Sequence, residues 1–413
     1  MGDMQGREVE LDVTGIAHGG ISVARLDGRV VFVGDTLPGE RVVARITEDR
    51  KKSFWRADTV SVVEASEHRR PHVWSAAALE VDPVDRAGGA EFGHIDLAHQ
   101  RELKGWVVRD ALVRTGGLAE SEATVAVEAL PGDDERGGTG WRTRVRLHLD
   151  AEGRPGQYAA RSHRVVAVRD LPLAADAVAE AAPLGESFPG EEHVDVLAPS
   201  VGGARLIIGK QTPTTITEVV GDREFRLDDG GFWQVHREAA STLTAAVQEM
   251  VDPELFDPRA ANLDLYGGVG LLAAALGDRF GAGVRVTSVE SDERATEHAS
   301  ENLADWLGAS AVTGRVERWV RQAAAQATAA ERERSRAATV VLDPPRSGAG
   351  KEVVAALGEL SPAQVVYVAC DPVALARDLA LLREVGYDVE ALRAFDLFPN
   401  THHVETVVRL RRR

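Results

Sequence analysis

A chain of 413 residues with 44% hydrophobic residues is long enough for roughly two or three domains with buried cores. Its single cysteine excludes internal disulfide pairs, all-cysteine zinc sites and four-cysteine iron–sulfur clusters. The formal net charge of −17 argues against a protein that coats nucleic acid indiscriminately, although a local basic face is compatible with it. No apolar run approaches the roughly 20 residues that cross a bilayer, and the polar start MGDMQGREVE lacks a signal-peptide core, so we expect a soluble, cytoplasmic protein.

Residues 8–64 form short alternating apolar runs that glycines separate, which predicts a small β-barrel. The segment HGGISVARLDGRVVFVGDTLPGERV resembles a TRAM domain, an RNA-binding barrel appended to several RNA-modifying enzymes. The resemblance implies an OB-like RNA-binding domain over residues 1–65. Within it, the run RKKSFWR at 50–56 suits phosphates and stacked bases, and it equally suits a solvated hairpin with a packed tryptophan.

We assign residues 66–235 to a central α+β domain that binds RNA or links the other two. Residues 65–100 have the Pro, Gly and Ala content of a linker, and an apolar periodicity then predicts a helix from Asp96 to Leu112. The irregular spacing of three histidines favours scattered surface residues over a metal site: His68, His72 and His94. No metal site is therefore predicted.

Arginines concentrate in residues 136–170, where eight of them stand against three acidic residues. An extended backbone would place three of these guanidiniums on one strand face, opposite the apolar Val145 and Leu147. They belong to Arg142, Arg144 and Arg146. That face is a candidate contact for RNA phosphates, and the alternative is a solvated strand face.

Strands and helices alternate within residues 236–413, and two strands at about 389–394 and 404–410 finish the series. This order predicts an α/β fold with a doubly wound, Rossmann-like sheet and a terminal hairpin. Ligands of such sheets bind at the carboxyl ends of the central strands. Residues 321–338 are expected to form a solvated helix of low complexity.

A glycine turn, LDLYGGVG at 263–270, follows the first strand of this domain directly. Such a turn lets a ligand approach the backbone, and Glu290 at the end of the next strand suits a ribose diol. The turn lacks the lysine of a P-loop, so that alternative is not favoured. Asp343, in DPPR, ends a strand that should lie beside the first one and face the same crevice.

The run VVYVACDP places Cys370 at the tip of a strand. A lone cysteine in an apolar run is usually a small packed hydrophobe, so chemistry needs further support. An antiparallel last strand would bring Glu405 to the same sheet edge, and a thiol with a carboxylate base is a recognisable catalytic pair.

The segments FWQVH, LDLYGGVG, VVLDPPRSG, VYVACDP and FPNTHHVETV, behind a TRAM-like barrel, resemble the RNA uracil-5-methyltransferase family, which uses S-adenosylmethionine. The resemblance implies that residues 236–413 form the methyltransferase domain, that Cys370 adds to carbon 6 of uracil and that Glu405 removes the carbon-5 proton. It also implies a set of cofactor contacts: Gln234, Tyr266, Gly267, Gly268, Glu290 and Asp343.

Three further residues near these motifs keep two interpretations each. Arg346 grips an RNA phosphate or pairs within its own loop. His402 and His403 orient Glu405 or the base, or they are satisfied structural histidines.

The chain departs from the family pattern at several positions. Where many relatives hold an iron–sulfur cluster, the matched positions are Arg70, Ala87 and Ala90, so we expect no cluster. Asp371 replaces the asparagine that commonly follows the nucleophile, and a nearby carboxylate disfavours a thiolate. Gly267 stands where a cysteine is common, and we expect that change to be harmless.

Three other functions remain open from the sequence. One is an amino-group methyltransferase with an Asp-Pro-Pro motif, which would not need Cys370. RNA cytosine-5-methyltransferases use similar chemistry but generally need two cysteines, and an idle RNA-binding protein would need none. The barrel favours ribosomal RNA over transfer RNA as the partner, because the family's transfer-RNA branch often lacks it. We expect a monomer with no membrane partner.

Overall fold

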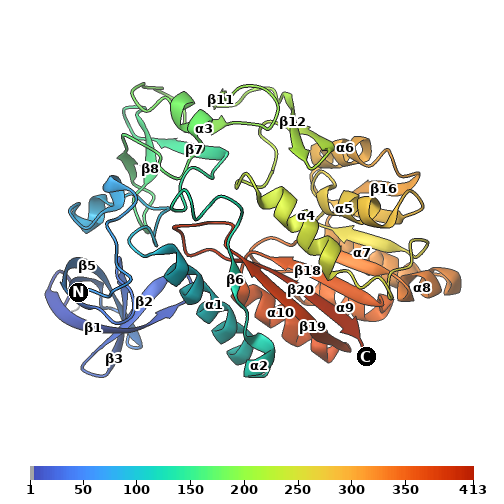
Figure 1. Ribbon diagram of the computed structural model, residues 1–413, viewed down its shortest axis with the longest axis horizontal. Coiled ribbons are helices and arrows are strands. Elements are labelled where there is room, and N and C mark those ends of the chain that lie inside the picture. Colours follow the sequence, from blue (N-terminus) through green and yellow to red (C-terminus); the bar gives the residue numbers. More distant parts are fainter. Residues whose placement is uncertain (1–3) are drawn as a thin grey trace.

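The computed structural model describes residues 4–413. It contains a closed β-barrel, a central antiparallel sheet, and a large mixed sheet with helices on both faces (Figure 1). The barrel has the strand order β1-β2-β3-β5-β4, as the alternating pattern predicts. Its strands are β1 (Glu8–Ala17), β2 (Ile21–Leu26), β3 (Arg29–Gly34), β4 (Arg41–Glu48) and β5 (Phe54–Glu64).

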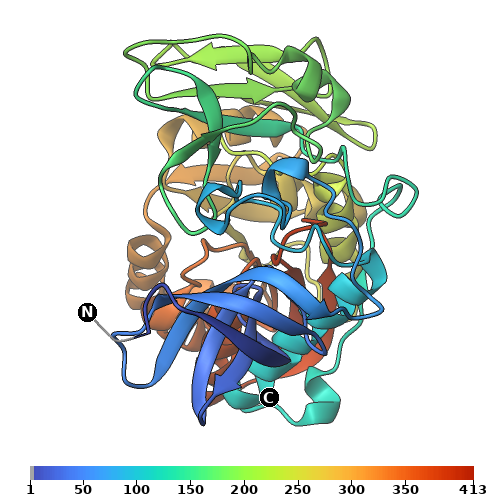
Figure 2. The ribbon, with the colours of Figure 1, turned by 90° about the vertical axis from the view of Figure 1, so that its left-hand side faces the viewer.

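The segment from residue 65 to residue 96 contains only two short 3-10 turns, η1 (Ser75–Ala77) and η2 (Pro83–Asp85), yet it is packed rather than linker-like. It lies between the barrel and the central sheet in both ribbon views (Figures 1 and 2). Trp74 joins the core of the central sheet. The expectation of scattered surface histidines is wrong for His72 and His94, which stack within this packed segment and whose pKa values burial lowers.

The predicted helix after Asp96 is α1 (Leu97–Arg114), and the Asp96 side chain caps it by accepting a hydrogen bond from the His99 N–H at 2.9 Å. Helix α1 packs on α10 of the C-terminal domain. After α2 (Glu120–Ala123), β6 (Val127–Glu128) pairs with β19 at the edge of the large sheet. The domain boundary at residue 235 therefore stays a prediction, because part of the central segment completes the C-terminal sheet.

The central sheet is antiparallel, with the order β11-β10-β7-β8-β9 and helix α3 beside β10. A separate hairpin, β12 with β13, lies against helix α6. These elements are β7 (Arg144–Leu149), β8 (Pro155–Tyr158), β9 (Val165–Ala167), α3 (Asp176–Ala181), β10 (His193–Leu197), β11 (Arg205–Ile208), β12 (Thr215–Val220) and β13 (Arg223–Asp228).

The large sheet has the order β16-β15-β14-β17-β18-β20-β19-β6, with β20 antiparallel to both of its neighbours. This strand order confirms the prediction of a doubly wound sheet with a terminal hairpin. Its strands are β14 (Asn262–Leu265), β15 (Arg285–Glu290), β16 (Gly308–Thr313), β17 (Thr339–Leu342), β18 (Gln364–Ala369), β19 (Tyr387–Phe395) and β20 (Glu405–Arg412). The helices are α4 (Ala239–Met250), α5 (Leu271–Phe280), α6 (Glu293–Asn302), α7 (Val316–Gln326), α8 (Ala329–Arg336), α9 (Gly350–Leu360) and α10 (Pro372–Glu384).

Strand β18 is buried along its whole length, and its alternate side chains enter two different cores. Val365 and Tyr367 pack with α9 and α10, whereas Val366 and Val368 pack with α4 and α5. Burial on both faces explains why β18 is continuously apolar rather than alternating. Across residues 4–413, no helix combines the length and the apolar character that crossing a membrane requires.

Candidate active site

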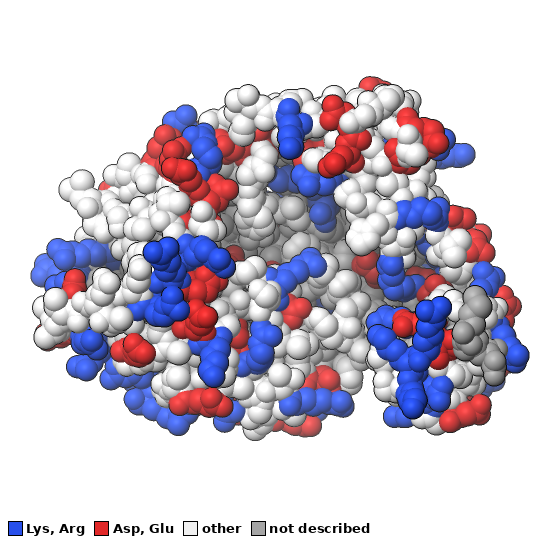
Figure 3. All heavy atoms as spheres, turned by 180° about the vertical axis from the view of Figure 1, so that it is seen from behind, with Lys and Arg blue, Asp and Glu red and all other residues white. Residues whose placement is uncertain are grey.

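A cavity of about 1100 Å³ opens at the carboxyl ends of the central strands of the large sheet. Figure 3 shows a hollow between the lobes of the molecule, with Lys and Arg side chains around it. Most of the residues that the sequence singles out line this cavity: Arg142, Gln234, Tyr266, Gly268, Glu290, Asp343, Arg346, Cys370 and Glu405. Gly267 lines an adjoining smaller cavity together with Gln234, Tyr266 and Asp343.

The glycine turn between β14 and α5 forms one wall of the cavity. Tyr266 has a φ of +64°, a left-handed conformation that is strained for an aromatic residue and that clusters at functional sites. A Cβ at Gly267 would collide with the hydroxyl of Ser288 and lie 2.7 Å from the Asp264 carboxylate. A side chain at position 267 would therefore need Ser288 of strand β15 to shift.

Glu290 ends strand β15 beside this turn. Its carboxylate accepts hydrogen bonds from the backbone N–H groups of Gly268 at 3.2 Å and Asp292 at 2.9 Å. Across the described residues the Tyr266 hydroxyl is buried without a hydrogen-bond partner, so a polar group of a ligand would satisfy it. A fixed carboxylate and an unsatisfied hydroxyl at a glycine turn fit the ribose and polar groups of a nucleoside cofactor.

Three carboxyl groups lie at or beside the cavity, of which Asp264 and Glu405 are buried and Asp343 is half-buried. Burial raises the pKa of Asp264 to about 7, and burial followed by the charge of Asp264 raises the pKa of Asp343 to about 7. The pKa of Glu405 lies well above its usual range, first because of burial and then because of Asp343, while Arg346 opposes the shift. Carboxyl groups with raised pKa values can hold and exchange protons.

Cys370 follows β18 and faces these carboxyl groups. Burial, then the charges of Glu405 and Asp343, raises the pKa of its thiol to about 12, and Arg346 opposes them. The thiol is therefore protonated in the free protein.

Asp371 does not add to this effect, because its carboxylate is engaged elsewhere. One oxygen caps helix α10 by accepting from the N–H groups of Val373 at 3.0 Å and Ala374 at 2.8 Å. The other oxygen lies 3.2 Å from Nε2 of His18 in the barrel. Pro372 at the first helical position completes this helix start.

The loop that follows Asp343 is held by a buried hydrogen-bond network. The hydroxyl of Tyr367 donates to the Asp378 carboxylate at 2.7 Å, and the N–H of Ala349 donates to the same oxygen at 2.7 Å. Tyr367 lies in β18 and Asp378 in α10. Both elements next to Cys370 thereby fix the loop that carries Arg346.

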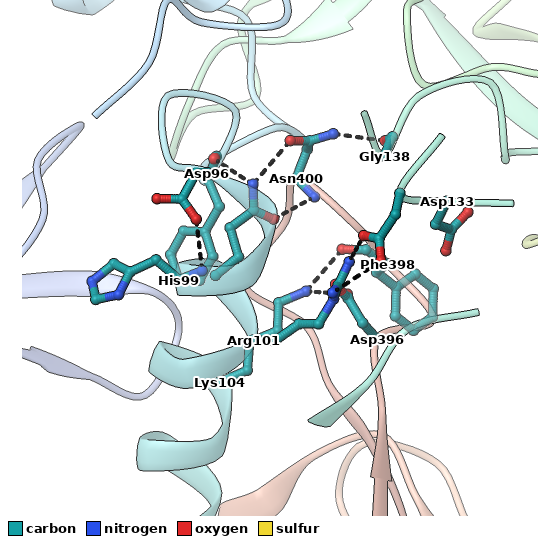
Figure 4. A network of polar contacts seen from close by, with 12 residues as sticks. Asp96, His99, Arg101, Lys104, Asp133, Gly138, Asp396, Phe398 and Asn400 are labelled. Carbon is teal, nitrogen blue, oxygen red and sulfur yellow. Dashed lines mark hydrogen bonds and ion pairs between the residues drawn. The ribbon is translucent and has the colours of Figure 1, made fainter. Parts of the chain in front are cut away.

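The segment that leads into Glu405 is held by helix α1 (Figure 4). Lys104, whose side chain is 0% exposed, donates to the Asp396 carboxylate at 2.5 Å and to the Phe398 carbonyl at 3.0 Å. Gln100 donates to the side-chain oxygen of Asn400 at 3.0 Å and accepts from its backbone N–H at 2.8 Å. These contacts join residues far apart in the chain.

The three predicted arginines do not form one face, because β7 begins at Arg144 and Arg142 precedes it. Arg144 pairs with Glu218 at 3.2 Å and donates to the Gly231 carbonyl at 2.9 Å, so it supports the loop before Gln234. Arg146 forms a bidentate pair with Asp195 at 2.7 Å. Only Arg142 lines the cavity, so the predicted basic strand face needs correction: two of its charges are already neutralised.

The remaining polar residues at the cavity form a chain of contacts. A guanidinium nitrogen of Arg346 lies 3.3 Å from Nε2 of His403, and burial with the nearby charges of His402 and Arg346 lowers the His403 pKa to about 3. His402 lies with its Nδ1 3.4 Å from the Glu91 carboxylate. His403 is therefore neutral and can accept from Arg346.

At the positions matched to cluster ligands in relatives, the structure contains packed residues. Ala87 and Ala90 are buried, and Arg70 donates to the side chain of Asn400. Within residues 4–413, no group of three or more His, Cys, Asp or Glu side chains could hold a metal ion.

Sequence reasoning missed several residues that complete the site. Among them are His18, Glu91 and Lys104, which lie far from the motifs in sequence. Of these three, only Lys104 could have been identified from the sequence. It recurs with Gln100 and Val108 at four-residue spacing, which places it on the buried face of α1.

Two family models match the chain. The TRAM domain matches residues 2–54, and the model described as tRNA (uracil-5-)-methyltransferase matches residues 225–413. Among relatives, a Streptomyces avermitilis protein described as an uncharacterized RNA methyltransferase is 37% identical, over 97% of this chain and 98% of its own. A Bifidobacterium longum RNA methyltransferase is 34% identical over 97% of this chain and 96% of its own.

Among solved structures, the Pyrococcus abyssi tRNA (uracil-54, C5)-methyltransferase in complex with S-adenosyl-L-homocysteine superposes with a TM-score of 0.70 at 20% identity, covering 97% of this chain and 100% of that chain. This likeness shows the same fold. The fold and the matches together define a methyltransferase that uses S-adenosylmethionine and acts on RNA. The chain belongs to the RNA uracil-5-methyltransferase family.

Proposed function

We propose that this enzyme forms 5-methyluridine in RNA, with Cys370 as the nucleophile and Glu405 as the general base. The observation that carries the proposal is that both residues, from two adjacent strands, line one cavity with Asp343 and the glycine turn. Bound S-adenosylmethionine supplies an electrophilic methyl group. Gln234, Tyr266, Gly267, Gly268, Glu290 and Asp343 are the residues that would hold it, because they line the cavity or its smaller neighbour.

Carbon 5 of uracil is a weak nucleophile, so the chain must first activate it. The Cys370 thiol first gives its proton to a cavity carboxylate other than Glu405, for which Asp343 is the candidate. The thiolate then adds to carbon 6, forming a carbon–sulfur bond and leaving electron density on carbon 5 as an enolate. After methylation, Glu405 takes the proton from carbon 5, the C5–C6 double bond re-forms and the sulfur leaves. The thiol reaches carbon 6 only if the uridine is out of its stack.

Arg142 and Arg346 are the proposed contacts to RNA phosphates near the cavity. Burial, followed by the charge of Arg346, lowers the pKa of Arg142, so a phosphate would relieve the repulsion between two guanidiniums that line the same cavity. The RNA cytosine-5-methyltransferase alternative is disfavoured because the chain has one cysteine. An idle RNA-binding protein would not explain a thiol and two proton-holding carboxyl groups in one cavity.

Mass spectrometry of nucleosides from cells with and without this gene tests the proposal, with ribosomal and transfer RNA fractionated first. We expect loss of 5-methyluridine from one fraction. The barrel favours ribosomal RNA, while the description of the matching family model names transfer RNA, so the fraction that loses the nucleoside identifies the substrate. Unchanged 5-methyluridine in both fractions would contradict the proposal.

A further inference from the structure

One turn of the barrel touches both loops that carry the proposed catalytic pair. The turn, His18 to Gly20, joins β1 to β2. Its contacts are Asp371, which follows Cys370 directly, and His402, which shortly precedes Glu405. An RNA-binding domain therefore reaches the two segments whose relative position decides the chemistry.

The first contact is the ion pair between His18 and Asp371. Nε2 of His18 lies 3.2 Å from the Asp371 carboxylate, whose other oxygen caps helix α10. The interactions with Asp371 raise the pKa of His18, although burial opposes them. Asp371 is thus held by His18 through one oxygen and by the start of helix α10 through the other. The residue before it in the chain is Cys370, the proposed nucleophile.

The second contact is a close backbone approach at Gly20. A Cβ at this position would collide with the side chain of His402 and lie 2.9 Å from Cε1 of Phe92. The neighbouring Gly19 has a similar left-handed backbone, with φ of +83° against +70°, but a Cβ there would meet nothing within 4 Å. Only one of the two glycines is therefore constrained by the catalytic domain.

We infer that this turn is a latch that positions the Cys370 and Glu405 loops, with His18 and Gly20 as positioning residues. When the turn is seated, the barrel and the cavity present one rigid RNA-binding surface and the thiol is aligned with a base in the cavity. When it is displaced, RNA still binds but the thiol reaches carbon 6 less often. The inference rests on the proposed function where it concerns bond formation to RNA.

The two glycines provide a matched pair of variants. Gly19→Ala and Gly20→Ala carry the same left-handed strain, but only Gly20→Ala displaces the turn from His402. With RNA containing 5-fluorouracil as the probe and saturating cofactor, we expect the rate of covalent adduct formation to fall at least about tenfold in Gly20→Ala relative to Gly19→Ala. The RNA dissociation constant should stay within about twofold.

The ion pair is tested by milder variants, because a pair that is partly exposed contributes little to folding. His18→Ala should slow adduct formation about threefold, and His18→Gln, which keeps a donor N–H, should recover most of that loss. Asp371→Asn keeps the helix cap and removes the charge, so combining it with His18→Ala should add nothing further. Asp12→Asn, which removes an ion pair to Arg41 elsewhere on the barrel, is the control.

Equal adduct rates in the two glycine variants would overturn the latch, as would a loss of RNA affinity with an unchanged rate at saturating RNA. If the unmodified enzyme forms no adduct, the proposed function is wrong. The rate at which iodoacetamide alkylates Cys370 then tests whether the turn positions the Cys370 loop. Cys370 is the chain's only cysteine, so labelling reports on it alone. Alkylation several-fold faster in Gly20→Ala than in Gly19→Ala would support the latch, and equal rates would overturn it.

Discussion

The thiol of Cys370 is protonated in the free enzyme because its surroundings are both buried and negative. Its pKa of about 12 arises from burial and from the charges of Glu405 and Asp343. The same surroundings include Glu405, the proposed base. A nucleophile suppressed in this way gains reactivity when positive charge enters the cavity or when a neighbouring carboxyl group is neutralised.

Neutralising Asp343 should therefore activate the thiol. A raised pKa means that only on the order of 0.01% of the thiol is ionised near pH 8. Asp343→Asn removes a negative neighbour, lowers the pKa of Cys370 and should speed its alkylation by iodoacetamide at pH 8 about tenfold. The measurement is mass spectrometry of the labelled chain across pH. The exposed Glu352→Gln should not change the rate, and an unchanged rate in Asp343→Asn would mean that its charge does not act on the thiol.

Two variants distinguish the proposed roles of Cys370 and Glu405. Glu405→Gln can form the carbon–sulfur bond but cannot remove the carbon-5 proton, so a protein–RNA adduct that survives denaturing electrophoresis should accumulate with ordinary uridine RNA and cofactor. Cys370→Ala should form no adduct. Normal turnover in Glu405→Gln would remove Glu405 from the base role.

Among the elements, helix α1 stabilises the catalytic segment through a buried ion pair. Lys104 and Asp396 are both almost fully buried, and burial lowers the pKa of Lys104 although Asp396 opposes the shift. Removing one partner of a buried ion pair greatly lowers the free energy of unfolding, because the other charge is left unpaired in the interior.

Lys104→Met should consequently destabilise the protein by about 3 kcal/mol, measured by urea unfolding. Arg114→Ala in the same helix removes only an exposed pair with Asp110 and should leave the unfolding midpoint in place. Replacing Asp396 by leucine in the Lys104→Met background should recover much of the loss. If Lys104→Met unfolds at the same urea concentration as the unmodified chain, the pair contributes nothing.

The elements that the sequence predicts well are those with local patterns. The barrel strands, α1, the glycine turn and the strand that ends at Cys370 all follow from periodicity and turn residues. Strand β16 was missed because GASAVT has small side chains that are only partly buried at the sheet edge. Strand β6 was missed because its two residues are fixed by pairing with β19 rather than by their own pattern.

The site residues also differ in whether local sequence patterns could predict their positions. Asp343 and Cys370 come together because parallel strands end at one edge, and Glu405 joins them because it begins the antiparallel strand β20 at that same edge. Topology alone predicts this arrangement. The contacts of His18, Lys104 and Arg70 depend on how separate domains pack, and no local pattern encodes that. The basic strand was predicted wrongly for the same reason. Glu218 and Asp195, which are distant in sequence, neutralise the charges of Arg144 and Arg146.

On the scale of the whole molecule, an acidic protein must bind an acidic polymer. With a formal net charge of −17, long-range attraction to RNA is absent, so local cations at the cavity must supply the electrostatic contacts. Arg142 and Arg346 line the cavity, whereas Arg146 is paired with Asp195 on the central sheet.

Removing Arg142 or Arg346 should weaken RNA binding and reduce the dependence of affinity on salt. Arg142→Ala or Arg346→Ala should lower the slope of log affinity against log salt by about 1. Arg146→Ala should leave the slope unchanged. Fluorescence anisotropy with labelled RNA across salt concentrations measures both quantities, and identical slopes in all variants would place the phosphate contacts elsewhere.

Strand β20 follows β19 in the chain, yet it lies between β18 and β19 in the sheet, and it begins with Glu405. During synthesis the barrel leaves the ribosome early, and domains fold as units from the N-terminal side. The RNA-binding barrel can therefore be folded on the order of tens of seconds before the strand that carries the proposed general base exists to enter the sheet. In the nascent chain, the capacity to hold RNA precedes the capacity to modify it.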